Sequence, residues 1–134
     1  MLALHWRRPG LFLYVLVADA VADLLAAGLK DVTNRPRPPV RYPEQHPLVH
    51  LPHDGSFPSG HAATSFVCAS VLSRVAPRLS VPLFALAIAI AFSRVYNAVH
   101  YPLDVLGGAV LGVLTALLLL RAGRRRWSRA QRSG

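Results

Sequence analysis

Three short stretches of the sequence combine cationic, imidazole and carboxylate side chains at spacings that suit the binding and transfer of a phosphate. The first, residues 30–38, holds a lysine and two arginines. The second, residues 58–61, reads Pro-Ser-Gly-His, and the third, residues 93–104, holds an arginine, a histidine and an aspartate. Arginine presents a planar fork that matches two phosphate oxygens, and lysine adds a compact positive charge. These residue types predict an anion site with its own nucleophile and acid.

Five residues are candidates for holding the phosphate itself. Lys30, Arg37 and Arg94 supply three positive charges. Ser59 and Gly60 stand where an apolar helix begins, and the free backbone N–H groups and dipole of a helix start favour an anion. Glycine also lets the backbone approach a ligand closely. We therefore expect the start of this helix and the three cations to surround one phosphoryl group.

Two histidines and one aspartate are the candidate catalytic groups. His100 and Asp104 are four residues apart, about one helical turn, so the carboxylate can accept a hydrogen bond from one imidazole nitrogen. The other nitrogen then stays free to act as a nucleophile. His61 is a second imidazole, suited to protonate the leaving oxygen.

Each of these residues alone has a simpler interpretation. A single histidine at a helix start is usually a capping or surface residue, and a single arginine at a membrane interface usually anchors its helix. Two histidines and an aspartate also suit zinc, but no third nitrogen or sulfur ligand stands at a clear spacing, and Cys68 is the one cysteine. The combination of three cations, a helix start and a His/Asp pair favours phosphate chemistry.

The three stretches resemble the tripartite signature of the type 2 phosphatidic acid phosphatase superfamily, which reads K-x6-R-P, P-S-G-H and S-R-x5-H-x3-D. All eleven fixed positions match in order and spacing between residues 30 and 104. The resemblance implies a reaction without metal or cofactor, in which His100 attacks phosphorus and forms a phosphohistidine, Asp104 holds His100, and His61 protonates the leaving group. It also implies which residues bind the phosphoryl oxygens: Lys30, Arg37, Ser59, Gly60 and Arg94.

Four apolar segments surround these motifs, at residues 11–29, 60–76, 81–95 and 103–120. Nineteen helical residues span about 28 Å, close to the thickness of a bilayer's hydrocarbon core. We therefore expect an all-α fold: a membrane-embedded bundle of about four transmembrane helices in a single domain, residues 1–134. A proline-rich loop, 30–59, and a basic tail, 121–134, complete it. The hydrophobic fraction of 53% excludes a disordered chain.

The sequence differs from the family pattern in the number of helices before the first motif. Its membrane members commonly have six helices, with the first motif after the third helix. In this sequence the first motif follows the first apolar segment. The fold therefore resembles a shortened type 2 phosphatidic acid phosphatase: either a minimal four-helix version or a chain whose start is missing.

Charge predicts the orientation in the membrane. The formal net charge is +9, and six arginines lie in the last fourteen residues, directly after an apolar segment. No nucleic-acid motif accompanies them, so we expect no nucleic-acid partner. With four spans, ten Lys and Arg lie on the side of the termini and five on the other side. The positive-inside rule then predicts cytoplasmic termini and an extracytoplasmic active site in the plasma or inner membrane.

For the charged residues outside the motifs, we expect structural rather than catalytic roles. Asp19 and Asp23 lie within the first apolar segment, where carboxylates usually find a partner on another helix; a proton relay is the alternative. The loop 30–59 also carries residues that either guide an anionic head group or are simply solvated, and we favour the second: Arg35, Arg41, His46, His50 and His53.

The sequence thus predicts an integral membrane lipid phosphatase whose partners are a phosphorylated lipid and the surrounding membrane lipids. The expected substrates are a polyprenyl phosphate or pyrophosphate, phosphatidic acid, or phosphatidylglycerophosphate. Four membrane spans argue against the haloperoxidase branch, which resembles a larger soluble protein. The alternative class is a non-catalytic membrane remnant or subunit that retains the phosphate site. A homo-oligomer is left open.

Overall fold

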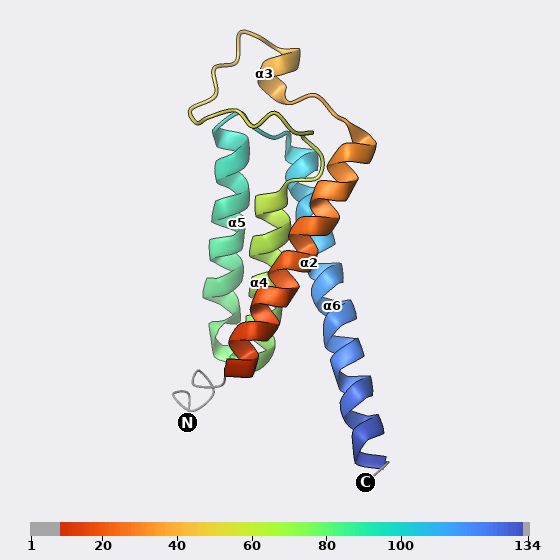
Figure 1. The fold of residues 1–134 in the computed structure, drawn as a ribbon. Helices are drawn as coiled ribbons and strands as arrows, with labels where there is room; N and C mark the ends of the chain where they lie inside the picture. The colour runs from red at the N-terminus through yellow and green to blue at the C-terminus, as the bar shows by residue number, and fades with distance from the viewer. Residues whose placement is uncertain (1–8, 133–134) are drawn as a thin grey trace.

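The computed structural model describes residues 9–132, and the regular secondary structure of that range is entirely helical (Figure 1). The expected all-α bundle is therefore confirmed. Its elements, in chain order, are α2 (Pro9–Thr33), α3 (Pro38–Arg41), α4 (Gly60–Val75), the 3-10 turn η1 (Pro77–Leu79), α5 (Ser80–Tyr96) and α6 (Pro102–Arg132).

Two helices run further than the sequence suggested. α2 continues to Thr33, so Lys30 lies in its last turn rather than in the following loop. Asn34, with φ of 42°, ends the helix in the left-handed conformation that asparagine tolerates. α6 continues to Arg132, so the expected basic tail is helical over most of its length, and residues 133–134 lie outside the described range.

In the part of the chain that the structure describes, three helical stretches are long and apolar enough to cross a membrane: Gly10–Arg41, Pro77–Tyr96 and Pro102–Gly123. α4 has only 16 residues, about 24 Å at the usual helical rise, and it contacts α2, α5 and α6. Large apolar side chains of the longer helices point outward, such as Phe12, Val81 and Leu118, which are 69%, 80% and 64% exposed. α4 is therefore the inner helix of the bundle, and the other three present apolar faces outward.

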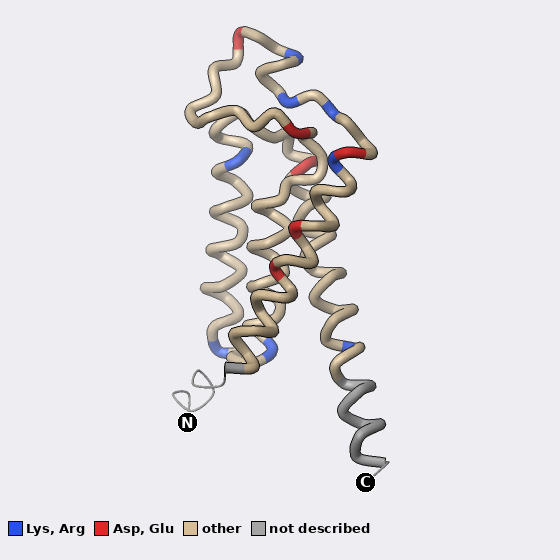
Figure 2. Tube along the Cα trace, viewed as in Figure 1, with Lys and Arg blue, Asp and Glu red and all other residues tan. Residues whose placement is uncertain are grey.

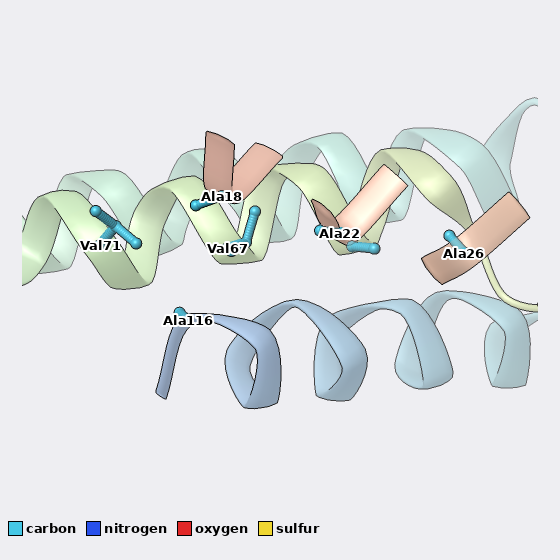
Figure 3. Close-up of a cluster of buried hydrophobic side chains, with 7 residues drawn as sticks. Ala18, Ala22, Ala26, Val67, Val71 and Ala116 are labelled. Carbon is cyan, nitrogen blue, oxygen red and sulfur yellow. The ribbon is translucent and has the colours of Figure 1, made fainter. Parts of the chain in front are cut away.

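The core of the bundle consists of small side chains (Figure 3). Ala18, Ala22 and Ala26 recur once per turn along α2 and pack in one cluster with Val67 and Val71 of α4. Small residues at this spacing let helices approach closely, which is the usual way that helices associate in lipid. α2 therefore lies tightly on α4 and carries its last turn to the start of that helix.

α6 approaches α4 even more closely, through Gly108 and Gly112. A Cβ atom on Gly108 would clash with the Ser59 carbonyl oxygen, and one on Gly112 would clash with the Ala63 carbonyl oxygen. Only glycine allows this backbone contact. The contact fixes the start of α6, with Asp104, beside the start of α4.

Charged residues gather at the two ends of the bundle, with further acidic positions along α2 (Figure 2). The loop containing α3 covers one end, and the described ends of the chain lie at the opposite end (Figure 1). All three sequence motifs belong to the loop end, because they include the end of α2, the start of α4, and the segment between α5 and α6.

Candidate active site

A cavity of about 390 Å³ lies at the loop end of the bundle. Six of the eight residues predicted for the site line it: Lys30, Arg37, Gly60, His61, Arg94 and His100. The other two, Ser59 and Asp104, are fully buried and are absent from its lining. The structure thus brings residues of all three motifs around one space.

Arg37 is the most enclosed of the cations, with 3% of its surface exposed. Its Nη1 donates to the Val99 carbonyl oxygen at 2.8 Å and lies 3.3 Å from His100 Nε2. Its Nε donates to the Asp54 carbonyl oxygen at 3.1 Å, and its Nη2 donates to the Asp54 carboxylate at 2.6 Å. Arg37 therefore links the loop, the third motif and the candidate nucleophile.

His100 has a fixed orientation. Its side chain is 4% exposed, and its Nδ1 lies 2.8 Å from the Ser56 carbonyl oxygen, an acceptor only. Nδ1 must therefore carry the proton, which leaves the lone pair on Nε2. Nε2 is the nitrogen beside Arg37. This is the tautomer that a nucleophilic imidazole requires.

Asp104 supports His100 less directly than the sequence predicted. Its Oδ2 lies 3.7 Å from His100 Nδ1, beyond hydrogen-bond distance, and the Ser56 carbonyl oxygen takes the Nδ1 proton instead. Oδ2 accepts from the Ser56 hydroxyl and from the Tyr101 backbone N–H at 2.9 Å. Ser56 therefore bridges the two side chains in place of the expected direct bond, with its carbonyl oxygen at His100 Nδ1 and its hydroxyl on Asp104.

Arg35 was expected to be solvated, and that expectation was also wrong. Its Nη1 donates to Asp104 Oδ1 at 2.7 Å, and its guanidinium lies 4.4 Å from the centre of the Tyr101 ring. Arg35 therefore neutralises the fully buried Asp104 carboxylate, which would be costly to bury unpaired. His50, from the same expected group, lines the cavity.

Asp54 joins two of the predicted phosphate ligands. One carboxylate oxygen accepts from Lys30 Nζ and the other from Arg37 Nη2. Partial burial alone would raise the pKa of Asp54, but the hydrogen bonds from Lys30 and Arg37 outweigh it and hold the pKa below its usual range. Asp54 is therefore ionised at neutral pH. Neither its sequence position nor any of the motifs indicated this role.

The start of α4 faces the cavity through Gly60 and His61. Ser59 is the N-cap: its hydroxyl accepts from the Ala62 N–H at 3.4 Å, and its own N–H donates to the Asp104 carbonyl oxygen at 2.9 Å. Ser59 thus holds the helix start rather than lining the cavity. The first N–H groups of a helix have no acceptor within it, so those of Gly60 and His61 suit an anion.

Two further carboxylates line the cavity from α2, Asp19 and Asp23. Asp19 Oδ1 lies 3.7 Å from the Cys68 sulfur on α4, so the expected interhelical hydrogen bond is present for Asp19. Arg94 lines the cavity from the last turn of α5. Among residues 10–123, whose side chains the structure describes, no group of three or more His, Cys, Asp or Glu side chains is arranged to hold a metal ion.

Together these residues can surround a tetrahedral anion and attack it. Three cations and a helix start supply positive charge, His100 offers a lone pair at Nε2, and His61 places a second, exposed imidazole in the same cavity. Oriented cations and N–H groups of this kind are the usual means of stabilising phosphoryl transfer.

Comparison with known proteins agrees with a site for phosphoryl transfer. The sequence model of the PAP2 superfamily matches residues 11–128 of the chain. The bacitracin transport permease protein BcrC of Bacillus licheniformis is 33% identical over 107 residues, which cover 80% of this chain and 53% of that protein. The lipid A 1-phosphatase of Rhizobium johnstonii is 31% identical over 131 residues, which cover 91% of this chain and 52% of that protein. The chain spans about half the length of these relatives.

The fold is similar to that of a solved structure. The crystal structure of LpxE from Aquifex aeolicus matches with a TM-score of 0.78 and 34% sequence identity, over 88% of this chain and 72% of that chain. The two proteins are therefore similar both in the arrangement of their helices and in amino-acid sequence.

Proposed function

Because the chain belongs to the PAP2 superfamily, we propose that it is a membrane phosphatase that hydrolyses a phosphomonoester or diphosphate head group of a lipid. The observation that carries the proposal is the state of His100, whose Nδ1 is bonded to the Ser56 carbonyl oxygen while Nε2 remains beside Arg37 in the cavity. Nε2 thus contacts one cation, Arg37, in a cavity that Lys30 and Arg94 also line.

The reaction proceeds in two displacements. The lone pair of His100 Nε2 attacks phosphorus, the bond from phosphorus to the leaving oxygen breaks, and His61 gives that oxygen a proton. The phosphoryl group is then held on Nε2 as a phosphohistidine. His61, now neutral, takes a proton from water, whose oxygen attacks phosphorus, and the bond from phosphorus to Nε2 breaks to release inorganic phosphate.

The cations replace a metal ion in this proposal. Lys30, Arg37 and Arg94 neutralise the phosphoryl oxygens, and the N–H groups of Gly60 and His61 add to them. Asp104, paired with Arg35, stabilises the positive charge that His100 acquires during attack.

A lipid substrate is supported by the surroundings of the cavity. α2 and α5 both contribute to its lining, and their outward faces are apolar. Leu24 on α2 and Phe92 on α5, close in sequence to lining residues, are 71% and 66% exposed. The name of the Rhizobium relative also specifies a phosphorylated lipid. We propose phosphatidic acid, phosphatidylglycerophosphate and polyprenyl phosphates or diphosphates as the substrates to test.

Release of inorganic phosphate from these lipids by the purified chain in detergent tests the proposal. We expect turnover by the wild type, retention of that turnover in excess EDTA, inhibition by vanadate, and no turnover by His100→Ala. Loss of activity on chelation, restored by one divalent ion, would contradict the metal-free reaction. A well-folded wild-type protein that releases no phosphate from any of the lipids would favour the non-catalytic alternative.

A further inference from the structure

Arg37 has no free hydrogen-bond donor among the described residues. A guanidinium carries five N–H donors. Those of Arg37 meet the Val99, Asp54 and Gly55 carbonyl oxygens, the Asp54 carboxylate and His100 Nε2. A phosphoryl oxygen can therefore reach Arg37 only by displacing one of these partners.

The Asp54 carboxylate is the partner best placed to leave. Its side chain is 44% exposed, whereas those of Lys30 and Arg37 are 13% and 3% exposed. The backbone beside it is constrained, since a Cβ atom on Gly55 would stand 2.8 Å from the Lys30 carbonyl oxygen. Rotation of the Asp54 side chain toward solvent, rather than movement of the loop, would free the Lys30 ammonium and the Nη2 donor of Arg37 that the carboxylate holds.

The two oxygens of Asp54 occupy the donors that two phosphoryl oxygens would use. One meets Lys30 and the other meets Arg37, both of which line the cavity with Asp54 itself. The carboxylate is thus an internal anion with a single negative charge, bound where a ligand anion would bind.

We propose that Asp54 determines specificity by competing for Lys30 and Arg37, so that a doubly charged phosphomonoester enters the site and a singly charged phosphodiester does not. The inference rests on the proposed function, because it assumes that these cations bind a phosphoryl group. When a phosphodiester displaces Asp54 from Lys30 and Arg37, one singly charged anion replaces another, and no electrostatic energy is gained. A phosphomonoester carries between one and a half and two negative charges near pH 7 and gains from the exchange.

This selectivity matters because most phospholipids around a membrane-embedded site are phosphodiesters. Without an internal competitor, a pocket with three cations would bind their head groups at the high concentration of the bilayer. Together with Asp19 and Asp23, Asp54 offsets the formal charge of the three cations, so the lining offers no net positive charge to such groups, and Asp54 can still yield its place to the rarer monoester.

Methyl phosphate and dimethyl phosphate form a matched pair of probes, since they differ in one methyl group and in charge. We expect wild-type protein in detergent to bind methyl phosphate and to bind dimethyl phosphate at least tenfold more weakly, as measured by calorimetry. In Asp54→Asn the affinity for dimethyl phosphate should rise at least tenfold and the discrimination should shrink. Phosphatidylglycerol should inhibit lipid hydrolysis by Asp54→Asn more strongly than hydrolysis by the wild type.

Two variants serve as controls. Glu44→Gln removes the same charge from an exposed position of the same loop, and it should discriminate as the wild type does. Asp54→Glu keeps the charge and should keep the discrimination.

Unchanged discrimination in a folded Asp54→Asn would overturn the inference while leaving the phosphatase proposal intact. So would loss of affinity for both probes, since Asp54 would then only position Arg37. A wild-type protein that neither binds methyl phosphate nor releases phosphate would instead contradict the proposed function.

Discussion

His100 owes its tautomer to a backbone carbonyl, and this changes what its neighbours must do. The Ser56 carbonyl oxygen takes the Nδ1 proton at 2.8 Å, while the Asp104 carboxylate lies 3.7 Å away. A carbonyl oxygen persists through any side-chain substitution at either position. Asp104 is thus left with two tasks: supplying negative charge near the ring and holding Ser56 and Arg35 in place.

Asp104→Asn should therefore lower kcat by about ten- to a hundredfold. The substitution weakens charge-assisted hydrogen bonds worth about 1.5–3 kcal/mol, and about 1.4 kcal/mol corresponds to a tenfold change in rate. In a serine-protease triad, where the carboxylate itself holds the tautomer, the same change costs about 10⁴. The measurement is kcat beside the thermal midpoint, with Asp31→Asn on exposed α2 surface as the control. A loss near 10⁴ would show that the carboxylate, not Ser56, sets the tautomer.

His61→Ala should separate substrates by their leaving groups. Proton donation by a positioned side chain contributes about 10²–10⁴ in rate. A lipid phosphate, whose leaving alkoxide needs the proton, should lose about that much, whereas an aryl phosphate with an acidic leaving group should lose less than about tenfold. Parallel kcat/KM measurements on both substrates decide the matter. Equal losses would assign His61 to phosphate binding instead of acid catalysis.

At the scale of residues, the sequence predicted which residues belong to the site better than it predicted their contacts. The motif spacing identified six residues that line one cavity, but not Ser56, Arg35 or Asp54. Ser56 acts through its backbone carbonyl, which any residue type could provide, so its identity carries no signal. Arg35 and Asp54 gain partners only because the loop folds back over the helix ends, and nothing in a proline-rich loop indicates that path.

The helices position the site by packing through residues that have almost no side chain. Ala18, Ala22 and Ala26 set α2 against α4, and Gly108 and Gly112 set α6 against α4. Apolar stretches predicted that these helices exist, and the structure confirms it. The apolar stretches did not predict that α4 would be the inner helix. Its 16 residues were interpreted as one more membrane span, like the other three helices.

Gly112→Ala should therefore impair both stability and activity. The added Cβ would clash with the Ala63 carbonyl oxygen and stand 2.9 Å from the Val67 nitrogen, and both are backbone atoms that cannot rotate away. Overpacking of this kind costs about 1–3 kcal/mol. Gly28→Ala makes the same change on α2 where nothing lies within 4 Å, and it should be neutral or stabilising by up to about 1 kcal/mol. Thermal midpoints in one detergent compare the two, and an equal response would contradict the close contact of α4 with α6.

At the scale of the whole molecule, the chain is a multi-pass membrane protein whose loop end contains the cavity. The positive-inside count predicts that this end is extracytoplasmic. That count includes residues 1–8, which lie outside the described range. The three motifs nevertheless belong to one end, so a single orientation decides which side of the membrane the cavity faces.

Thiol labelling of intact cells checks the orientation. In a Cys68→Ala background, Glu44→Cys in the exposed loop should react with a membrane-impermeant reagent. Arg78→Cys in η1, exposed at the opposite end, should react only after the cells are opened. The reverse pattern would place the active site in the cytoplasm.

The cavity is lined by both α2 and α5, whose outer faces are apolar. A substrate whose tail stays in the bilayer would therefore meet the enzyme by lateral diffusion in two dimensions. The quantity that governs turnover is then the mole fraction of substrate in the membrane or micelle, and not its concentration in the sample. Adding neutral detergent at a fixed amount of substrate should slow the reaction by surface dilution, and a Michaelis constant expressed per volume would have no fixed value.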